Sequence, residues 1–318
     1  CSVVRKALED ALTGRLDMLD GTVFPHTCDS MQRLSDIWRL NTKFPFFADI
    51  VLPVTLSRES SFRYLVDILR TFRTEIEKGL SVRIDDNDLR RSCALYNDIR
   101  SALRDLSDMR AERPAILSGR EYATVLKAAM IMDREDFRER LLDLLWRLPR
   151  SREETRDRGG PRILLSGGLC DQPDLFGMFD GAGVAIVGDD LCTGLRYADG
   201  AINLTGDPVE ALAQRYVSRA TCPAKHSSIT ARAEHLTMLA RSRRAAGVIF
   251  ILLKFCEPHA FDYPYLREAL EKEGMATLLL ELEDRLPPQG QVATRLETFR
   301  HLLMRRMPTA STEVRETS

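Results

Sequence analysis

The sequence lacks the features that would place it in a membrane or on nucleic acid. Its 318 residues contain no apolar run approaching the roughly 18 to 20 residues of a membrane-spanning helix. Its 46 basic and 47 acidic side chains leave a formal net charge of −1, whereas nucleic acid or an anionic membrane favours a protein with a basic face. We therefore expect neither of these as the main partner.

Two short motifs are missing as well. The seven cysteines form no C-x-x-C pair, and an odd number of widely scattered cysteines does not indicate a disulfide framework. We expect a reducing, cytoplasmic environment. A phosphate-binding loop is also absent, because residues 188–194, GDDLCTG, lack its glycine spacing and its lysine.

The order of apolar segments predicts an α/β protein. Strands are expected at 162–165, 184–187, 248–253 and 276–280, with helices between or after them, which is typical of a doubly wound parallel sheet. Strands at 21–24 and 48–54, with helices capped by Ser2 and by Asp29 or Ser30, predict a second Rossmann-like domain. Because the chain begins at Cys1 without an initiator Met, we expect this first domain to be incomplete at its N-terminus.

The middle of the chain has a different pattern. Apolar residues from 58 to 150 recur at helical spacing and predict about four helices without strands. They form either a packing and linker region or a surface that contacts another subunit. Residues 151–160, SREETRDRGG, indicate a boundary. The predicted domains are thus 1–57 (partial α/β), 58–150 (helical) and 151–318 (Rossmann-like).

Three cysteines are candidate ligands. Cys256 follows the apolar strand 248–253 and precedes a helix expected to open near Asp262, at the sheet edge where α/β proteins bind ligands. Cys28 has a similar setting, and Cys1 lies beside a helix N-terminus, whose dipole favours a thiolate. Three thiolates can hold an iron–sulfur cubane and leave its fourth iron open. A lone cysteine in such a setting is more often a small buried hydrophobe than a ligand.

Other cysteines and two aspartates allow further interpretations. Cys93 lies within a helical run and is predicted to be structural. Cys192 follows Asp189 and Asp190 at a strand end. These two carboxylates could act in acid–base chemistry or bind magnesium, or they could satisfy backbone donors in a turn.

His26 and His259 each lie within three residues of a candidate ligand. Either could donate a hydrogen bond to a cluster sulfur or protonate an intermediate, or be an ordinary loop histidine. No aspartate partner for either histidine can be identified from the sequence.

Five segments together resemble a known family. The segments CSVVRKALEDAL, LDGTVFPHTCDSMQRLSDIW, VGDDLCTGLRY, LLKFCEPHAFDYPYLREALEKEGMATLLLELE and GQVATRLETF resemble the iron–sulfur subunits of 2-hydroxyacyl-CoA dehydratases and ATP-dependent benzoyl-CoA reductases. The resemblance implies a 4Fe–4S cluster held by Cys1, Cys28 and Cys256, with His26 and His259 as candidates for proton handling.

The same resemblance implies partners and a reaction. It implies a heterodimer with a homologous second subunit, an acyl-CoA thioester substrate, and an ATP-hydrolysing iron–sulfur activator that delivers a low-potential electron. The reaction would be radical dehydration, making the enzyme a lyase, or reduction of an aromatic ring, making it an oxidoreductase of anaerobic metabolism.

Two alternatives stay open. A sister branch binds a double-cubane 8Fe–9S cluster and reduces small molecules without a CoA substrate, and Cys170, Cys192 and Cys222 could supply the additional thiolates. Their sequence context is more similar to the benzoyl-CoA reductase side. The other alternative is a non-catalytic subunit that serves assembly or electron relay.

Overall fold

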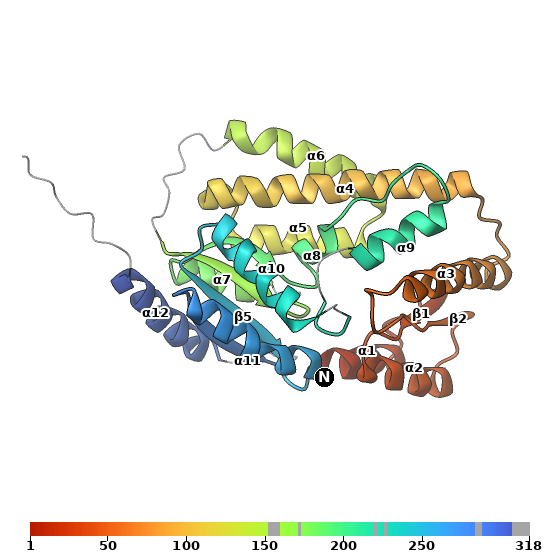
Figure 1. The fold of residues 1–318 in the computed structure, drawn as a ribbon, viewed down its shortest axis with the longest axis horizontal. Coiled ribbons are helices and arrows are strands. Elements are labelled where there is room, and N and C mark those ends of the chain that lie inside the picture. The colour runs from red at the N-terminus through yellow and green to blue at the C-terminus, as the bar shows by residue number, and fades with distance from the viewer. Residues whose placement is uncertain (152–159, 171–172, 219–221, 226–227, 284–287, 307–318) are drawn as a thin grey trace, which may run out of the picture.

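The computed structural model describes residues 1–151, 160–170, 173–218, 222–225, 228–283 and 288–306. Most of the predicted boundary at 151–160 lies outside these residues. Within the described part of the chain, no helix is both long enough and apolar enough to span a bilayer. The fold is mixed α/β with parallel sheets, as the sequence predicted (Figure 1).

The N-terminal elements surround a small sheet. They are α1 (Ser2–Leu12), β1 (Gly21–Pro25), α2 (Asp29–Asn41) and β2 (Phe46–Ile50). β1 and β2 pair in parallel, and the rings of Phe24 and Trp38 pack edge to face with centroids 5.2 Å apart. The strand predicted at 48–54 lies instead at 46–50, where the chain pairs with β1 and alternate residues are buried. This sheet has two strands in the described residues, so the prediction of two Rossmann-like domains is not confirmed.

Four α-helices follow, as predicted. They are α3 (Glu59–Gly79), α4 (Asp86–Glu112), α5 (Gly119–Ile131) and α6 (Arg134–Ser151), with a 3-10 turn at Pro114–Ile116. Asp85 and Ser118 begin α4 and α5 with capping boxes, each satisfying main-chain donors at the helix start. Figure 1 shows α4, α5 and α6 running alongside one another as a helical layer. Their shared core includes Ile99, Leu106 and Tyr122.

In the part of the chain that the structure describes, the second sheet has four parallel strands in the order β4-β3-β5-β6. These strands are β3 (Arg162–Gly167), β4 (Ala185–Asp190), β5 (Gly247–Leu253) and β6 (Ala276–Leu282). The helices that follow them are α7 (Pro173–Gly181), α8 (Leu195–Ala198), α9 (Pro208–Ser218), α10 (Ile229–Ser242), α11 (Glu257–Lys272) and α12 (Gln289–Arg306). The strands occupy the predicted regions with slightly longer ends.

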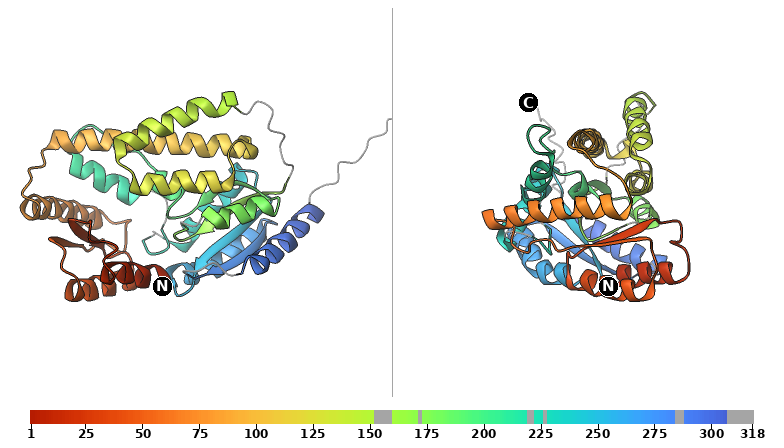
Figure 2. Two further views of the ribbon diagram at one scale, coloured as in Figure 1. Left: turned by 180° about the vertical axis from the view of Figure 1, so that it is seen from behind. Right: turned by 90° about the vertical axis from the view of Figure 1, so that its right-hand side faces the viewer.

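Helices cover both faces of this sheet (Figure 2). On one face, α7 and α12 pack against Ile163 and Ile249. On the other, α10 and α11 pack against Leu164 and Phe250. Successive strand residues point to opposite faces of the sheet. Because helices cover both faces, residues on both are apolar, which explains the continuous hydrophobic runs in the sequence.

The strand order reverses between β3 and β5, and such a reversal opens a crevice at the carboxyl ends of the two strands. At the end of β3, a Cβ atom on Gly167 would lie 2.0 Å from the carbonyl oxygen of Ile251, so the close approach of the two strands there leaves no room for a side chain. In both Figure 1 and Figure 2 the start of α1 lies beside the start of α11, which follows β5. The fold therefore brings the first residues of the chain to this crevice.

Candidate cofactor site

A cavity of about 400 Å³ joins the three cysteines predicted as ligands. Cys1, Cys28 and Cys256 all line it, although they come from opposite ends of the chain. Each of the three is partly exposed. Asp262 and Phe261, from the first turns of α11, also line the cavity.

Each of these cysteines is the N-cap of a helix: Cys1 of α1, Cys28 of α2 and Cys256 of α11. The sequence analysis predicted later starts for these helices: Ser2 as the cap of the first, Asp29 or Ser30 as the cap of the second, and an opening near Asp262 for the third. These predictions were wrong. Three helix N-termini therefore border one cavity. The main-chain N–H groups of the first helical turns and the positive dipole ends favour negative charge there, which suits thiolates and a group carried by thiolates.

The environment of Cys256 combines opposing effects. Burial raises the pKa of its thiol, and nearby Cys28 and Cys192 raise it further, while the main-chain N–H of His259 lowers it. The preceding residue, Phe255, has a left-handed backbone with φ of 64° and a side chain that is 73% exposed. A left-handed aromatic residue is uncommon and persists only where surrounding structure fixes it. Phe255 lines the cavity together with Phe261.

His26 has a carboxylate partner that the sequence did not reveal. Its Nε2 lies 2.9 Å from Oδ1 of Asp49 on β2, and Ser35 on α2 donates a hydrogen bond to the same oxygen. His26 is two residues before Cys28 in the sequence. A histidine oriented by a carboxylate is an arrangement that enzymes use for proton transfer.

His259 lies in the first turn of α11 and is 5% exposed. Burial, together with the charges of Arg196 and Arg232, lowers its pKa from 6.5 to about 3. The imidazole is therefore neutral near pH 7. Its ring faces Gly168, where a Cβ atom would lie 3.5 Å from Nε2. A neutral ring can position other groups by hydrogen bonding, whereas the cationic form needed for general-acid catalysis is disfavoured.

A buried ion-pair network lies next to the cavity, and sequence reasoning missed it. Arg196 places Nε 3.1 Å from Asp190 Oδ1, and Arg232 reaches both Asp190 at 3.4 Å and Asp262 at 2.8 Å. Ser166 donates a further hydrogen bond to Asp190 at 3.0 Å. Because Asp262 also lines the cavity, the network ties the start of α11 to the carboxyl ends of β3 and β4.

Asp189, the neighbour of Asp190, satisfies backbone donors. Its Oδ1 accepts hydrogen bonds from the N–H groups of Leu191 and Leu195 at 3.2 and 2.8 Å, and Tyr122 donates to Oδ2 at 3.1 Å. Burial raises its pKa. Of the two interpretations of this aspartate pair, the turn-forming one describes Asp189, and Asp190 belongs to the ion-pair network.

The four remaining cysteines occupy different environments. Cys192 and Cys222 are close enough to influence each other electrostatically, and the charge of Arg196 favours the Cys192 thiolate against the effect of burial. Cys170 instead lines a separate cavity of about 460 Å³. Cys93 is 5% exposed and packs with Ile202 in a hydrophobic cluster, as expected for a structural residue.

Among the described residues, no three histidine, cysteine, aspartate or glutamate side chains come together to hold a single metal ion. A cubane is a larger body, and its ligands stand further apart than those of one ion. The relevant observations for a cubane are therefore the shared cavity and the soft donor set.

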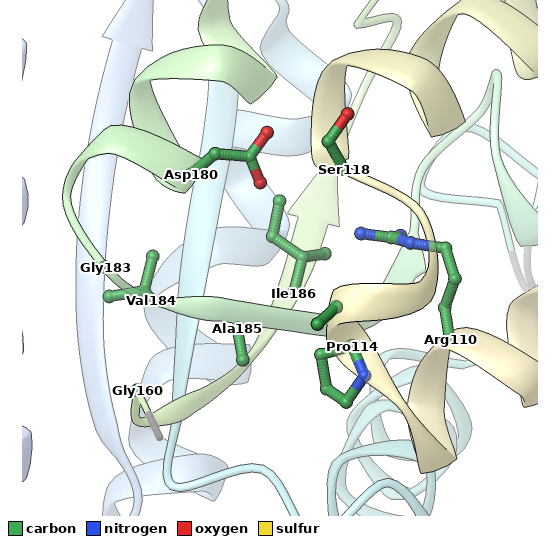
Figure 3. A pocket seen from close by; sticks show the side chains of 10 residues that line it. Arg110, Pro114, Ser118, Gly160, Asp180, Gly183, Val184, Ala185 and Ile186 are labelled. Carbon is green, nitrogen blue, oxygen red and sulfur yellow. The ribbon is translucent and has the colours of Figure 1, made fainter. Parts of the chain in front are cut away.

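A smaller cavity of about 100 Å³ lies at the opposite, amino-terminal edge of the second sheet, next to the start of β4 (Figure 3). Arg110, Ser118 and Asp180 face it. Asp180 accepts hydrogen bonds from the N–H groups of Gly119 and Arg120 and so caps α5. Ser118 and Asp180 therefore cap α5, and Arg110 donates to the carbonyl of Leu117. None of the seven cysteines lines this cavity.

Comparison with known proteins identifies the family. A family model described as 2-hydroxyglutaryl-CoA dehydratase, D-component, matches residues 1–303. The chain belongs to this family. It is 26% identical over 303 residues to the (R)-phenyllactyl-CoA dehydratase beta subunit of Clostridium sporogenes, covering 95% of this chain and 80% of the relative.

Two other relatives represent different reactions. The chain is 25% identical over 305 residues to the beta subunit of (R)-2-hydroxyglutaryl-CoA dehydratase of Acidaminococcus fermentans, covering 94% of this chain and 80% of the relative. It is 25% identical over 272 residues to the C subunit of benzoyl-CoA reductase of Thauera aromatica, covering 84% of this chain and 70% of the relative. The relatives are thus subunits of enzymes, both dehydratases and a reductase, which agrees with the family resemblance found in the sequence.

Proposed function

We propose that this chain is the 4Fe–4S subunit of an enzyme that dehydrates or reduces an acyl-CoA thioester. The observation that carries the proposal is the single cavity lined by Cys1, Cys28 and Cys256, each the N-cap of a helix. Soft thiolates and surrounding helix N-termini suit an anionic iron–sulfur group. The names of the relatives support the reaction class.

The three cysteines would hold the cluster and leave one iron without a protein thiolate. When bound, such a cluster supplies single electrons at low potential and a Lewis-acidic iron. Phe255 and Phe261, which line the cavity, would add apolar surface beside the cluster. His26, oriented by Asp49, is positioned to move a proton near Cys28, and neutral His259 would orient the start of α11.

The proposal includes partners. The relatives are named as beta and C subunits, which supports a homologous second subunit for this chain. An ATP-hydrolysing activator protein would supply the electron, as the family resemblance of the sequence implies. In the alternative role, limited to assembly or electron relay, this chain would hold the cluster but would not itself contact the substrate.

One observation favours a second candidate, the double-cubane reductase. Cys192 and Cys222 lie near each other, and Cys192 also acts electrostatically on Cys256. A further thiolate would then have to come from Cys170, which lines the separate cavity. This placement of Cys170 favours a single cubane.

The cysteine ligands can be tested by anaerobic purification and iron and sulfide analysis. We expect about four irons per chain in the wild-type protein. C28S should lose most of the iron, because a serine hydroxyl is a harder and far less acidic donor. C93S, which alters a buried cysteine of α4, is the matched control and should retain all of it. Equal iron in the two variants would refute the ligand assignment.

A further inference from the structure

Lys225 is a buried cation with an unusual set of neighbours. It is 6% exposed, and its Nζ donates a hydrogen bond to the main-chain carbonyl of Leu52 at 3.2 Å. Among the described residues, no carboxylate forms an ion pair with it. The acidic groups whose charges act on it are the thiols of Cys222 and Cys28.

The backbone around Lys225 forms part of the cavity wall. Cys222 and Lys225 face each other across a tight turn, in which the N–H of Lys225 donates to the carbonyl of Cys222 at 3.0 Å. The two residues inside the turn, Pro223 and Ala224, line the cysteine cavity. The lysine is thus fixed immediately behind one wall of the cavity, and its position does not depend on a flexible surface side chain.

Leu52 follows β2 in the N-terminal part of the chain, whereas Lys225 precedes α10. The hydrogen bond between them therefore joins the segment that follows β2 to the turn whose residues Pro223 and Ala224 line the cavity. Burial lowers the pKa of Lys225, and the two thiols act against this shift. An ammonium group withdrawn from water without a negative partner is strongly unfavourable, so an anion in the neighbouring cavity would stabilise the charged form of Lys225.

We propose that the Lys225 ammonium is the counter-charge for the anionic cluster held at Cys28, and that it raises the reduction potential and retention of that cluster. The inference rests on the proposed function. Net charge and polar groups around the sulfurs set the potential of an iron–sulfur cluster, and residues behind the ligands govern how tightly a metal group is held. Lys225 is a positioning residue, because it acts through the ligands.

Three variants separate the charge of Lys225 from its hydrogen bond. K225Q keeps an N–H donor for the Leu52 carbonyl and removes the charge. K225R keeps the charge. K272M removes the charge of an exposed lysine that pairs with Glu268 on the outer surface of α11, and it is the matched control for loss of one positive charge.

Each protein is purified anaerobically with its cluster. The midpoint potential is measured by a redox titration followed by electron paramagnetic resonance, and iron release to a chelator is timed. We expect K225Q to have a more negative midpoint potential and to lose iron on the order of ten-fold faster. K225R and K272M should match the wild type in both measurements.

The outcomes are distinct. A K225Q protein with the wild-type potential and the wild-type rate of iron release would overturn the inference, and a lower melting temperature alone would identify Lys225 as only a structural anchor. If K225Q does not fold, K225R provides the test. K225R keeps the charge, so a midpoint potential that differs from that of the wild type would contradict the proposal. Wild-type protein without iron would instead contradict the proposed function, whatever the behaviour of the Lys225 variants.

Discussion

Replacing Arg232 with methionine should strongly destabilise the protein. Arg232 is 1% exposed and contacts Asp262 at 2.8 Å and Asp190 at 3.4 Å. In R232M, Asp190 keeps Arg196 at 3.1 Å, whereas Asp262 loses its contact with a buried guanidinium. Removing one partner of a buried ion pair costs about 3–5 kcal/mol, and we expect a loss of unfolding free energy in this range.

The assay is urea unfolding followed by circular dichroism under anaerobic conditions. R241M is the control, because it removes an arginine that pairs with Glu273 at the surface, and exposed pairs contribute about 0–1 kcal/mol. The double variant R232M/D262N should recover part of the loss, since the buried carboxylate is then also removed. A loss for R232M no larger than that for R241M would refute the network as a stabilising element.

Three further predictions concern the site. Simultaneous replacement of Cys170, Cys192 and Cys222 by alanine should preserve about four irons per chain; loss of half the iron from a wild type containing about eight would support the double cubane. Turnover of an acyl-CoA should require activator, reductant and ATP together, because an ordinary ferredoxin, with a potential of roughly −400 mV, is too weak a reductant to form a ketyl radical from a thioester. Turnover with a chemical reductant alone would contradict this. The pKa of His259 is about 3 in the folded protein, against an ordinary value of 6.5 for the unfolded chain. Between these two pH values the imidazole is protonated in the unfolded chain and neutral in the folded protein. Its contribution to unfolding free energy should thus fall by about 1.4 kcal/mol per pH unit below pH 6.5, and H259Q should show a weaker decline between pH 7 and 5.

The sequence predicted the second sheet well because its signal is local. A strand buried on both faces is a continuous apolar run, and 248–253 and 276–280 show this plainly. The helix starts at Cys1, Cys28 and Cys256 were predicted too late. Cysteine is not among the residues favoured at N-caps, so the prediction moved to the nearest serine or aspartate.

The residues that support the site could not be predicted, because their partners are distant in the sequence. Arg232 resembles any arginine of an amphipathic helix, and only the packing of α10 against the sheet brings it to Asp190 and Asp262. The contact between His26 and Asp49 similarly depends on the parallel pairing of β1 with β2. Tertiary contacts of this kind leave no periodic pattern.

The cavity is lined by residues from both ends of the chain, so it cannot form until most of the protein has been synthesised. Cys28 leaves the ribosome well before Cys256 is made, and at about 5–20 residues per second the interval is on the order of tens of seconds. During this interval the early thiols have no completed binding pocket. On the proposed function, cluster insertion would follow synthesis of α11, and the early thiols would have to stay reduced until then.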